Sequence, residues 1–385
     1  MRVILIGPAH PLRGGIANFN QALCSAFVKM NKYASIESYS LQYPNFLFPG
    51  KTQFEEGDPP TDISITSNIN SINPITWFKV AKRIKKAAPD YVIIHFWMPF
   101  FAPTLLNITR IIKKRTNIKV IVIVHNAIPH EKRLGDAFLT KRFFSQCDGF
   151  ITMSKTVLAD VNSIVPKTDK LCIPHPIYNI FGEKINRKKA INKLHLKEEE
   201  RYLLFFGIIR RYKGLDLLLK AMGDERIKKQ NIKLIVAGEF YEDRSYYDLL
   251  INKYQIAENI IICNHFISSN DVKYYFSIAD MVVQPYHTAT QSGVTQIAYN
   301  FECPMLVTDV GGLAETVPAG KVGYVTSTDP LSIANAILDF YENNRKQTFS
   351  QNVVIEKEKY SWDKMVFAIE NLVRKLKLED NIKKN

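Results

Sequence analysis

Residues 281–315 read MVVQPYHTATQSGVTQIAYNFECPMLVTDVGGLAE, and this stretch decides the fold. An apolar run, Met281 to Val283, ends at Pro285 and predicts a buried strand. A loop of small residues and a helix from Val294 to about Asn300 follow, and then a second apolar strand, Pro304 to Thr308, leads to Gly311-Gly312. A strand, a glycine loop and a helix N-terminus, twice in succession, is how α/β proteins present backbone N–H groups to an anion. Taken alone, the stretch is equally typical of two ordinary strand-to-helix turns.

Residues 203–216, LLFFGIIRRYKGLD, favour the first interpretation. They predict an apolar strand, a glycine at its end, a basic loop and an amphipathic helix. Together the two stretches resemble the C-terminal half of the retaining glycosyltransferases of family 4, which have the GT-B fold. In that family the basic pair of a Gly-x-x-Arg-x-x-Lys-Gly loop holds the diphosphate of a nucleotide-sugar. The resemblance extends over nearly the whole chain, and it implies this role for Arg210 and Lys213.

The resemblance implies an α/β protein with two facing Rossmann-like domains, parallel sheets, an active site in the cleft and a C-terminal crossover helix. The residues agree, because apolar strand-like runs alternate with helical periodicity in both halves. We expect an N-terminal acceptor-side domain over residues 1–182 with the helix at 361–385, a charged linker over 183–201, and a nucleotide-sugar-binding domain over 202–360. The expected strands are Val3–Ile6, Tyr91–Ile94, Val120–Val124, Phe150–Thr152, Leu171–Ile173, Leu203–Phe206, Lys233–Ala237, Ile260–Cys263, Met281–Gln284 and Met305–Thr308.

The net charge of +14 belongs mainly to the first half of the chain. Residues 1–182 carry 22 Lys and Arg against 11 Asp and Glu. Two basic clusters, Lys79 to Lys86 and Arg110 to Lys119, contribute to this excess. A basic domain suggests an anionic membrane surface, a nucleic acid or an anionic substrate as partner, although a solvated helix face is the simpler explanation. We expect no nucleic acid, since no recognised module or aromatic-basic interleaving occurs.

The composition also bears on the compartment. Five scattered cysteines without a C-x-x-C pair indicate a reducing environment and argue against a disulfide framework. The most apolar stretch, Tyr91 to Ile108, is interrupted by His95, Pro99 and Pro103, so a membrane-spanning helix is not expected there. We therefore expect a cytoplasmic protein, peripheral on the inner face of the membrane.

Polar residues follow two strands of the first half. After the first strand, the loop of residues 7–17 contains Gly14-Gly15, which leaves room for a ligand to approach the backbone. His125 ends the third expected strand, where ligands sit in open α/β sheets. A lone histidine is usually structural, but the matching family position carries a His that reaches the reacting sugar. We assign His125 to catalysis on that resemblance. The acceptor-side candidates are His95, Asn126, His130 and Glu131.

A departing diphosphate needs fixed positive charge, from Arg as a planar multi-donor group and Lys as a point charge. We therefore assign Arg210 and Lys213 to catalysis as well. The sequence contains no Asp-x-Asp, which agrees with a metal-independent reaction, and no cofactor is expected. The expected donor-binding residues are Gly14, Gly15, Gly207, Arg210, Lys213, Thr290, Gln291, Ser292, Gly293, Val294 and Thr295.

The sequence departs from the family at one pair of positions. Most relatives carry two glutamates by the donor, and the alignment places these positions at Ala289 and Ile297. The loop from Thr290 to Thr295 is then expected to hold the sugar and phosphates. We expect transfer of a sugar to a saccharide or lipid-linked acceptor in cell-surface polysaccharide synthesis. Two alternatives stay open: a GT-B sugar-nucleotide epimerase and a non-catalytic nucleotide-sugar-binding partner subunit.

Overall fold

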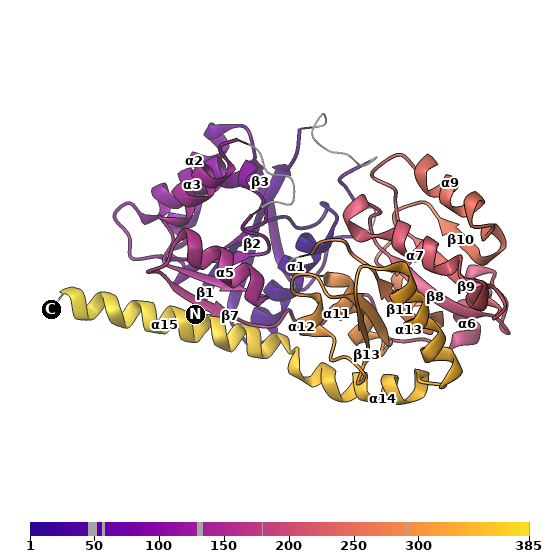
Figure 1. The fold of residues 1–385 in the computed structure, drawn as a ribbon. Coiled ribbons are helices and arrows are strands. Elements are labelled where there is room, and N and C mark those ends of the chain that lie inside the picture. The colour runs from indigo at the N-terminus through magenta and orange to yellow at the C-terminus, as the bar shows by residue number, and fades with distance from the viewer. Residues whose placement is uncertain (45–51, 56–57, 129–133, 179, 290–291, 385) are drawn as a thin grey trace. The chain divides into compact units, whose positions relative to one another are not determined.

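The computed structural model describes residues 1–44, 52–55, 58–128, 134–178, 180–289 and 292–384. The chain forms two compact units, Met1–Pro176 with Ser361–Asn385, and Ile177–Tyr360. Each unit has a parallel sheet covered by helices, as Figure 1 shows. The expected α/β fold with two Rossmann-like sheets is therefore confirmed.

The first unit is built on β1 (Arg2–Ile6), β2 (Tyr33–Leu41), β3 (Ser64–Asn70), β4 (Tyr91–Phe96), β5 (Lys119–Val124), β6 (Gly149–Thr152) and β7 (Asp169–Cys172). Its helices are α1 (Gly15–Lys29), α2 (Pro74–Ala87), the short 3₁₀ helix η2 (Pro99–Phe101), α3 (Ala102–Lys113), α4 (Asp136–Phe144), α5 (Lys155–Ile164) and α15 (Trp362–Lys384). The described strands lie in the order β3-β2-β1-β4-β5-β6-β7. Chain order reverses between the neighbours β1 and β4, and ligands bind open α/β sheets at such a point, outside the carboxyl ends of the strands.

The second unit is built on β8 (Arg201–Phe206), β9 (Ile232–Ala237), β10 (Ile260–Cys263), β11 (Met281–Gln284), β12 (Met305–Thr308) and β13 (Gly323–Thr326). Its helices are α6 (Arg187–Leu194), η3 (Arg211–Lys213), α7 (Leu215–Met222), α8 (Glu225–Lys228), α9 (Ser245–Lys253), η4 (Ala257–Asn259), α10 (Val272–Ile278), α11 (Gly293–Asn300), α12 (Leu313–Thr316), α13 (Pro330–Glu342), α14 (Lys346–Glu356) and η5 (Lys357–Lys359). The described strands lie in the order β10-β9-β8-β11-β12-β13, which puts the reversal between β8 and β11.

The central strands were found from sequence because both of their faces are covered. Every residue of β4 and β5 is buried, and a strand buried on both faces has a nearly continuous apolar run. β2, β3 and β13 were missed. β3 and β13 are edge strands, and the sequence of β3, SITSNIN, is polar because much of it faces solvent. Part of the expected long loop from Leu41 to Asp62 lies outside the described residues.

The structure differs from the expected linker. Residues 183–201 contain α6, which packs against α10 and belongs to the second unit. The unit boundary lies at Pro176, not at residue 182. α6 was not predicted because only two of its residues, Ala190 and Ile191, are buried, which is too few to give a helical hydrophobic period. The segment is charged because most of the other residues of α6 face solvent.

The C-terminal helix α15 belongs to the first unit and packs against β5 and β6. Met365, Val366, Ile369 and Val373 are fully buried on its inner face. The helix continues to Lys384, beyond the frayed tail expected from Glu379 onward. Within the described part of the chain, no helix is long and apolar enough to cross a membrane.

Candidate functional site

The basic loop of the second unit is tied firmly to its surroundings. It leaves β8 at Gly207 and closes at Gly214, whose φ of +67° lies in the left-handed region. A Cβ on Gly214 would lie 1.8 Å from the carbonyl oxygen of Pro285, so only glycine fits there. The backbone N–H of His287 donates to the Tyr212 carbonyl at 2.7 Å, and its Nε2 lies 2.8 Å from Asp216 Oδ1. These contacts hold the basic loop against the loop that follows β11.

Lys213 lies in this loop with its side chain turned inward. The residue is 7% exposed, and its Nζ lies 5.5 Å from the ring centre of Tyr286. Burial lowers the pKa of the ammonium, and the neighbouring positive charge of Arg210 lowers it further. Within the described residues, the ammonium has no hydrogen-bond or ion-pair partner. A buried cation without a partner is costly, so this position is prepared for an anion.

The two arginines of the loop point to different places. Arg210 is half-buried, with its guanidinium 5.6 Å from the ring centre of Tyr241. Arg211 is exposed and stacks on Tyr246 of α9 at 3.9 Å. Arg211 is therefore occupied by a packing contact, while Arg210 and Lys213 share one environment.

The N-terminus of α11 follows the β11 strand. Ser292 is its N-cap residue, and the Ser292 side chain makes no capping hydrogen bond. Val294 lies beside Gly207, because a Cβ on Gly207 would come within 3.1 Å of Lys213 Nζ and 3.8 Å of Val294 Cγ2. The first backbone N–H groups of a helix have no partner within the helix and favour negative charge. Lys213 and the start of α11 therefore form one anion-binding candidate within the second unit.

Thr295 and Gln284 extend this candidate. The Thr295 hydroxyl donates to Gln284 Oε1 at 3.2 Å. Gln284 Nε2 and Gln296 Oε1 are buried, and both lack a hydrogen-bond partner within the described residues. Gln284 and Gln296 were not predicted from sequence, because single polar residues in apolar runs give no spacing signal. Thr290 and Gln291 lie outside the described residues.

Gly293 has a packing reason to be glycine. A Cβ there would come within 3.1 Å of Tyr178 Cε2, and Tyr178 is buried. A bulky residue at this position would push against the core of the unit and destabilise the fold. A substitution of Gly293 therefore cannot show whether the residue is glycine to admit a ligand. Ala289 and Ile297, at the two glutamate positions, are buried at 9% and 6% exposure. A nearby carboxylate, Glu302, does not replace these glutamates, because it forms ion pairs with Lys184 and Lys357.

In the first unit, the glycine pair lies at the start of α1. Gly14 has a φ of +120°, which only glycine adopts readily, and it is the N-cap residue of the helix. A Cβ on Gly14 or Gly15 would meet no described atom within 4 Å. The surrounding protein therefore does not require glycine at residue 15, and the open space beside it agrees with close approach of a ligand.

Three histidines gather at the carboxyl ends of the strands around Phe19 of α1. The ring centres of His95, His125 and His175 lie 5.6, 5.2 and 4.9 Å from that of Phe19. His95 Nδ1 lies 2.9 Å from His125 Nε2, so one ring donates a hydrogen bond to the other. His95 was expected on the acceptor side, but it is fully buried behind His125. His130 and Glu131 lie outside the described residues.

Burial keeps all three imidazoles neutral at physiological pH. Desolvation lowers the pKa of His95 to about 3 and that of His175 to about 4. Desolvation also lowers the pKa of His125 well below its usual value, with a further contribution from the positive charge that His95 or His175 would carry. A neutral His125 can donate or accept a hydrogen bond without adding charge.

The histidine group should make the protein acid-sensitive. As pH falls below about 6.5, these histidines become protonated in the unfolded chain but stay neutral in the folded protein. The free energy of unfolding therefore falls by about 1.4 kcal/mol per pH unit per histidine. His95→Gln keeps a hydrogen-bonding group but removes one of these protons. We expect its melting temperature to drop less than that of the wild type between pH 7 and pH 5. Equal drops would contradict neutral burial of His95.

Further polar atoms face the same edge of the sheet. Asn20 Oδ1, His95 Nε2, Asn126 Oδ1 and Thr152 Oγ1 are buried and lack a partner within the described residues. Asn20 and His95 both flank Gly7 at the end of β1, within 3.2 Å of where its Cβ would lie. Asn126 was expected here, whereas Asn20 and Thr152 were missed because they stand alone in apolar segments. These groups give the strand ends a polar interior beneath His125.

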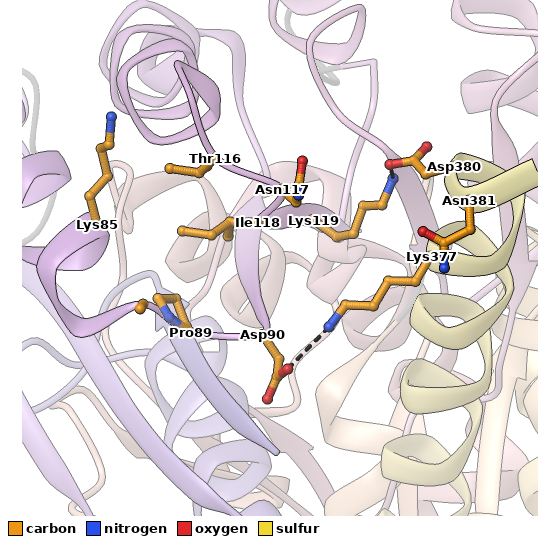
Figure 2. Close-up of a pocket in the computed structure, with 11 residues that line it drawn as sticks. Lys85, Pro89, Asp90, Thr116, Asn117, Ile118, Lys119, Lys377, Asp380 and Asn381 are labelled. Carbon is orange, nitrogen blue, oxygen red and sulfur yellow. Dashed lines mark hydrogen bonds and ion pairs between the residues drawn. The ribbon is translucent and has the colours of Figure 1, made fainter. Parts of the chain in front are cut away.

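A cavity of about 440 Å³ lies at the opposite, amino end of the same strands. Figure 2 shows Lys377 of α15 reaching Asp90, at 3.1 Å, just before β4. The other lysines of the cavity are also engaged, Lys119 with Asp380 and Lys85 with the Lys114 carbonyl. The lysines that line this cavity therefore differ from Lys213, which has no ion-pair partner among the described residues. No cluster of three metal-ligating side chains occurs in the part of the chain that the structure describes.

Comparison with known families accounts for both units. The family described as Glycosyltransferase Family 4 matches residues 13–177, and the one described as Glycosyl transferases group 1 matches residues 186–362. The chain belongs to glycosyltransferase family 4. The second match contains the basic loop and the start of α11, and the first contains Gly14, Gly15 and the histidine group.

Similar proteins agree with this assignment. An uncharacterized glycosyltransferase of Methanocaldococcus jannaschii is 28% identical over 246 residues, which span 58% of this chain and 59% of that protein. The O-antigen chain mannosyltransferase C of Escherichia coli is 23% identical over 305 residues, 76% of this chain and 78% of that one. The solved HepE structure of Anabaena, in complex with UDP, has a TM-score of 0.71 at 13% identity and covers 96% of this chain and 100% of HepE. That structural likeness supports the GT-B fold.

Proposed function

We propose that the protein transfers a sugar from a nucleotide-diphosphate sugar to a saccharide or lipid-linked acceptor in cell-surface polysaccharide synthesis. The observation that carries the proposal is the buried ammonium of Lys213 beside the start of α11, which has no ion-pair partner among the described residues. An ammonium, the Arg210 guanidinium and helix N-terminal amides together suit a diphosphate, which carries several negative charges. The UDP bound to HepE supports a nucleotide-sugar donor, and the O-antigen mannosyltransferase relative supports a saccharide acceptor.

The leaving diphosphate is the part of the reaction that needs most help. Arg210 and Lys213 neutralise the charge that develops on it, a contribution metal ions make in other sugar transferases. We therefore propose that transfer is independent of a metal. A titration with EDTA tests this: the initial rate should stay constant, and a rate restored only by a divalent cation would contradict it.

The first unit contributes His125 and the polar edge around it. We propose that the neutral imidazole contacts a hydroxyl of the transferred sugar and that the acceptor binds on this unit. We further propose retention by front-face displacement, in which the acceptor oxygen bonds to the anomeric carbon as the bond to the diphosphate breaks. The leaving phosphate oxygen takes the acceptor proton, so no carboxylate nucleophile is needed.

Gly15 offers a test that separates ligand approach from folding. Gly15→Ala adds a methyl group where no described atom lies within 4 Å, and alanine favours the helix by up to about 1 kcal/mol. We expect an unchanged or higher melting temperature together with a transfer rate lowered roughly tenfold. A stabilised variant with full activity would show that no ligand approaches this backbone.

The proposed reaction is tested by incubating the protein with a panel of nucleotide-sugars, with and without a lipid-extract acceptor. Release of nucleoside diphosphate only with acceptor, and a sugar-bearing product by mass spectrometry, is the expected result. Turnover without acceptor would favour an epimerase. Binding of a nucleotide-sugar with no transfer to any acceptor would favour the partner-subunit alternative.

A further inference from the structure

One exposed face of α2 combines apolar and basic side chains. Ile75, Phe78, Lys79, Lys82 and Lys86 follow one another at helical spacing, so they share a face. Ile75 and Phe78 are 64% and 49% exposed. The opposite face packs into the unit through its own apolar residues. Large apolar side chains that lie together on the exposed face of a charged helix indicate an interaction surface.

The charge of this region is strongly one-sided. Residues 71–119 carry ten Lys and Arg and a single acidic residue, Asp90. The structure separates these cations into two classes. Arg83 pairs with Glu37 and Lys113 with Asp148, so these two cations are engaged within the unit. Lys79, Lys82 and Lys86 are exposed, and within the described residues they have no ion-pair partner.

Helix α4, which packs against α3, also has an exposed aromatic residue beside a cation. α3 packs against both α2 and α4, so the three helices form one layer. Phe138 of α4 is 64% exposed, with the Arg142 guanidinium 5.8 Å from its ring centre. On α2, the Lys82 ammonium likewise lies 4.3 Å from the ring centre of Phe78. Both aromatic rings therefore stand on the surface with a cation beside them.

We propose that this layer docks on an anionic membrane surface through Ile75 and Phe78 of α2 and Phe138 of α4. The apolar groups enter the boundary between headgroups and acyl chains, and the lysines meet lipid phosphates. The inference rests on the proposed function in one respect, since a lipid-linked acceptor would be presented at such a surface. Aliphatic side chains favour a bilayer over a nucleic acid, and repulsion between like charges disfavours a second copy of the same face.

Flotation of the full-length protein with two kinds of vesicle tests the proposal. Vesicles of phosphatidylcholine and phosphatidylglycerol in equal parts should bind it, and vesicles of phosphatidylcholine alone should not. Each lysine near an anionic surface contributes about fivefold to partitioning, so Lys79→Gln with Lys82→Gln should lower it about 25-fold. Phe78→Ser should lower it by roughly tenfold or more.

The control removes the same charge from another exposed helix face. Lys188→Gln with Lys189→Gln, on α6 of the second unit, should leave partitioning nearly unchanged. The proposal would be overturned if the control and test variants lost vesicle partitioning equally, or if the α2 variants bound vesicles like the wild type. It would also be overturned if the α2 face bound duplex DNA or a second copy of the protein and did not bind vesicles. Nucleoside diphosphate binding, measured on the same variants, should stay at the wild-type level. Its absence from the wild type would count against the proposed function, not against the docking surface.

Discussion

Lys213→Met should weaken the binding of a nucleoside diphosphate roughly tenfold to hundredfold. A charge-assisted hydrogen bond to phosphate contributes about 1.5–3 kcal/mol, and methionine keeps the length of the side chain without the charge. The same change should stabilise the ligand-free protein, because it removes a buried ammonium that has no hydrogen-bond or ion-pair partner among the described residues. A gain of about 1 kcal/mol would raise the melting temperature by roughly 2–4 °C.

The two effects have opposite signs, which makes the result hard to mimic by damage to the fold. Isothermal titration calorimetry gives the affinity, and thermal unfolding without ligand gives the stability. Arg211→Met is the matched control: it removes a cation from the same loop, but one that stacks on Tyr246. It should change the affinity much less. Unchanged affinity in Lys213→Met would remove the main argument for a diphosphate site.

His125→Ala should lower the transfer rate about a hundredfold to a thousandfold while nucleoside diphosphate affinity stays constant. Loss of one hydrogen-bonding group that acts on the reacting sugar has an effect of this size. The proposed diphosphate site lies in the second unit, whereas His125 lies in the first, so the two measurements report on different groups. Initial rates at saturating donor, with calorimetry on the same sample, check the prediction.

His265→Ala, an exposed histidine after β10, is a control that should leave the rate nearly unchanged. The transfer rate of His95→Gln should lie between those of His125→Ala and His265→Ala. Glutamine can still hydrogen-bond His125, but it does not fix the His125 ring as firmly. A His125→Ala rate within a factor of a few of the wild type would show that this ring only packs against Phe19.

The sequence predicted the fold class and the basic loop because both leave strong local patterns. Strands such as β4 and β5 are apolar throughout, and Arg210, Lys213 and Gly214 follow β8 within one short loop. The edge strand β3 and the helix α6 have too few buried residues to give a period. A polar strand at a sheet edge is decided by its pairing with a neighbour, which no local window contains.

The candidate site divides in the same way. Glycines and basic residues at fixed spacing could be assigned from sequence, whereas Asn20, Thr152 and Gln284 are isolated residues brought to the strand ends by topology. His95 was predicted from sequence as an acceptor-side candidate, but only the structure shows it hydrogen-bonded to His125. Arg83 pairs with Glu37 of β2, whereas Lys79, Lys82 and Lys86 have no ion-pair partner among the described residues, and this difference likewise depends on the fold around α2.

A crystal structure of the protein with a bound nucleoside diphosphate would test the central claim most directly. The account predicts the terminal phosphate within hydrogen-bond distance of Lys213 Nζ and the Arg210 guanidinium, with the backbone N–H groups at Val294 and Thr295 directed toward it. A diphosphate bound elsewhere, with Lys213 still unpartnered, would contradict it.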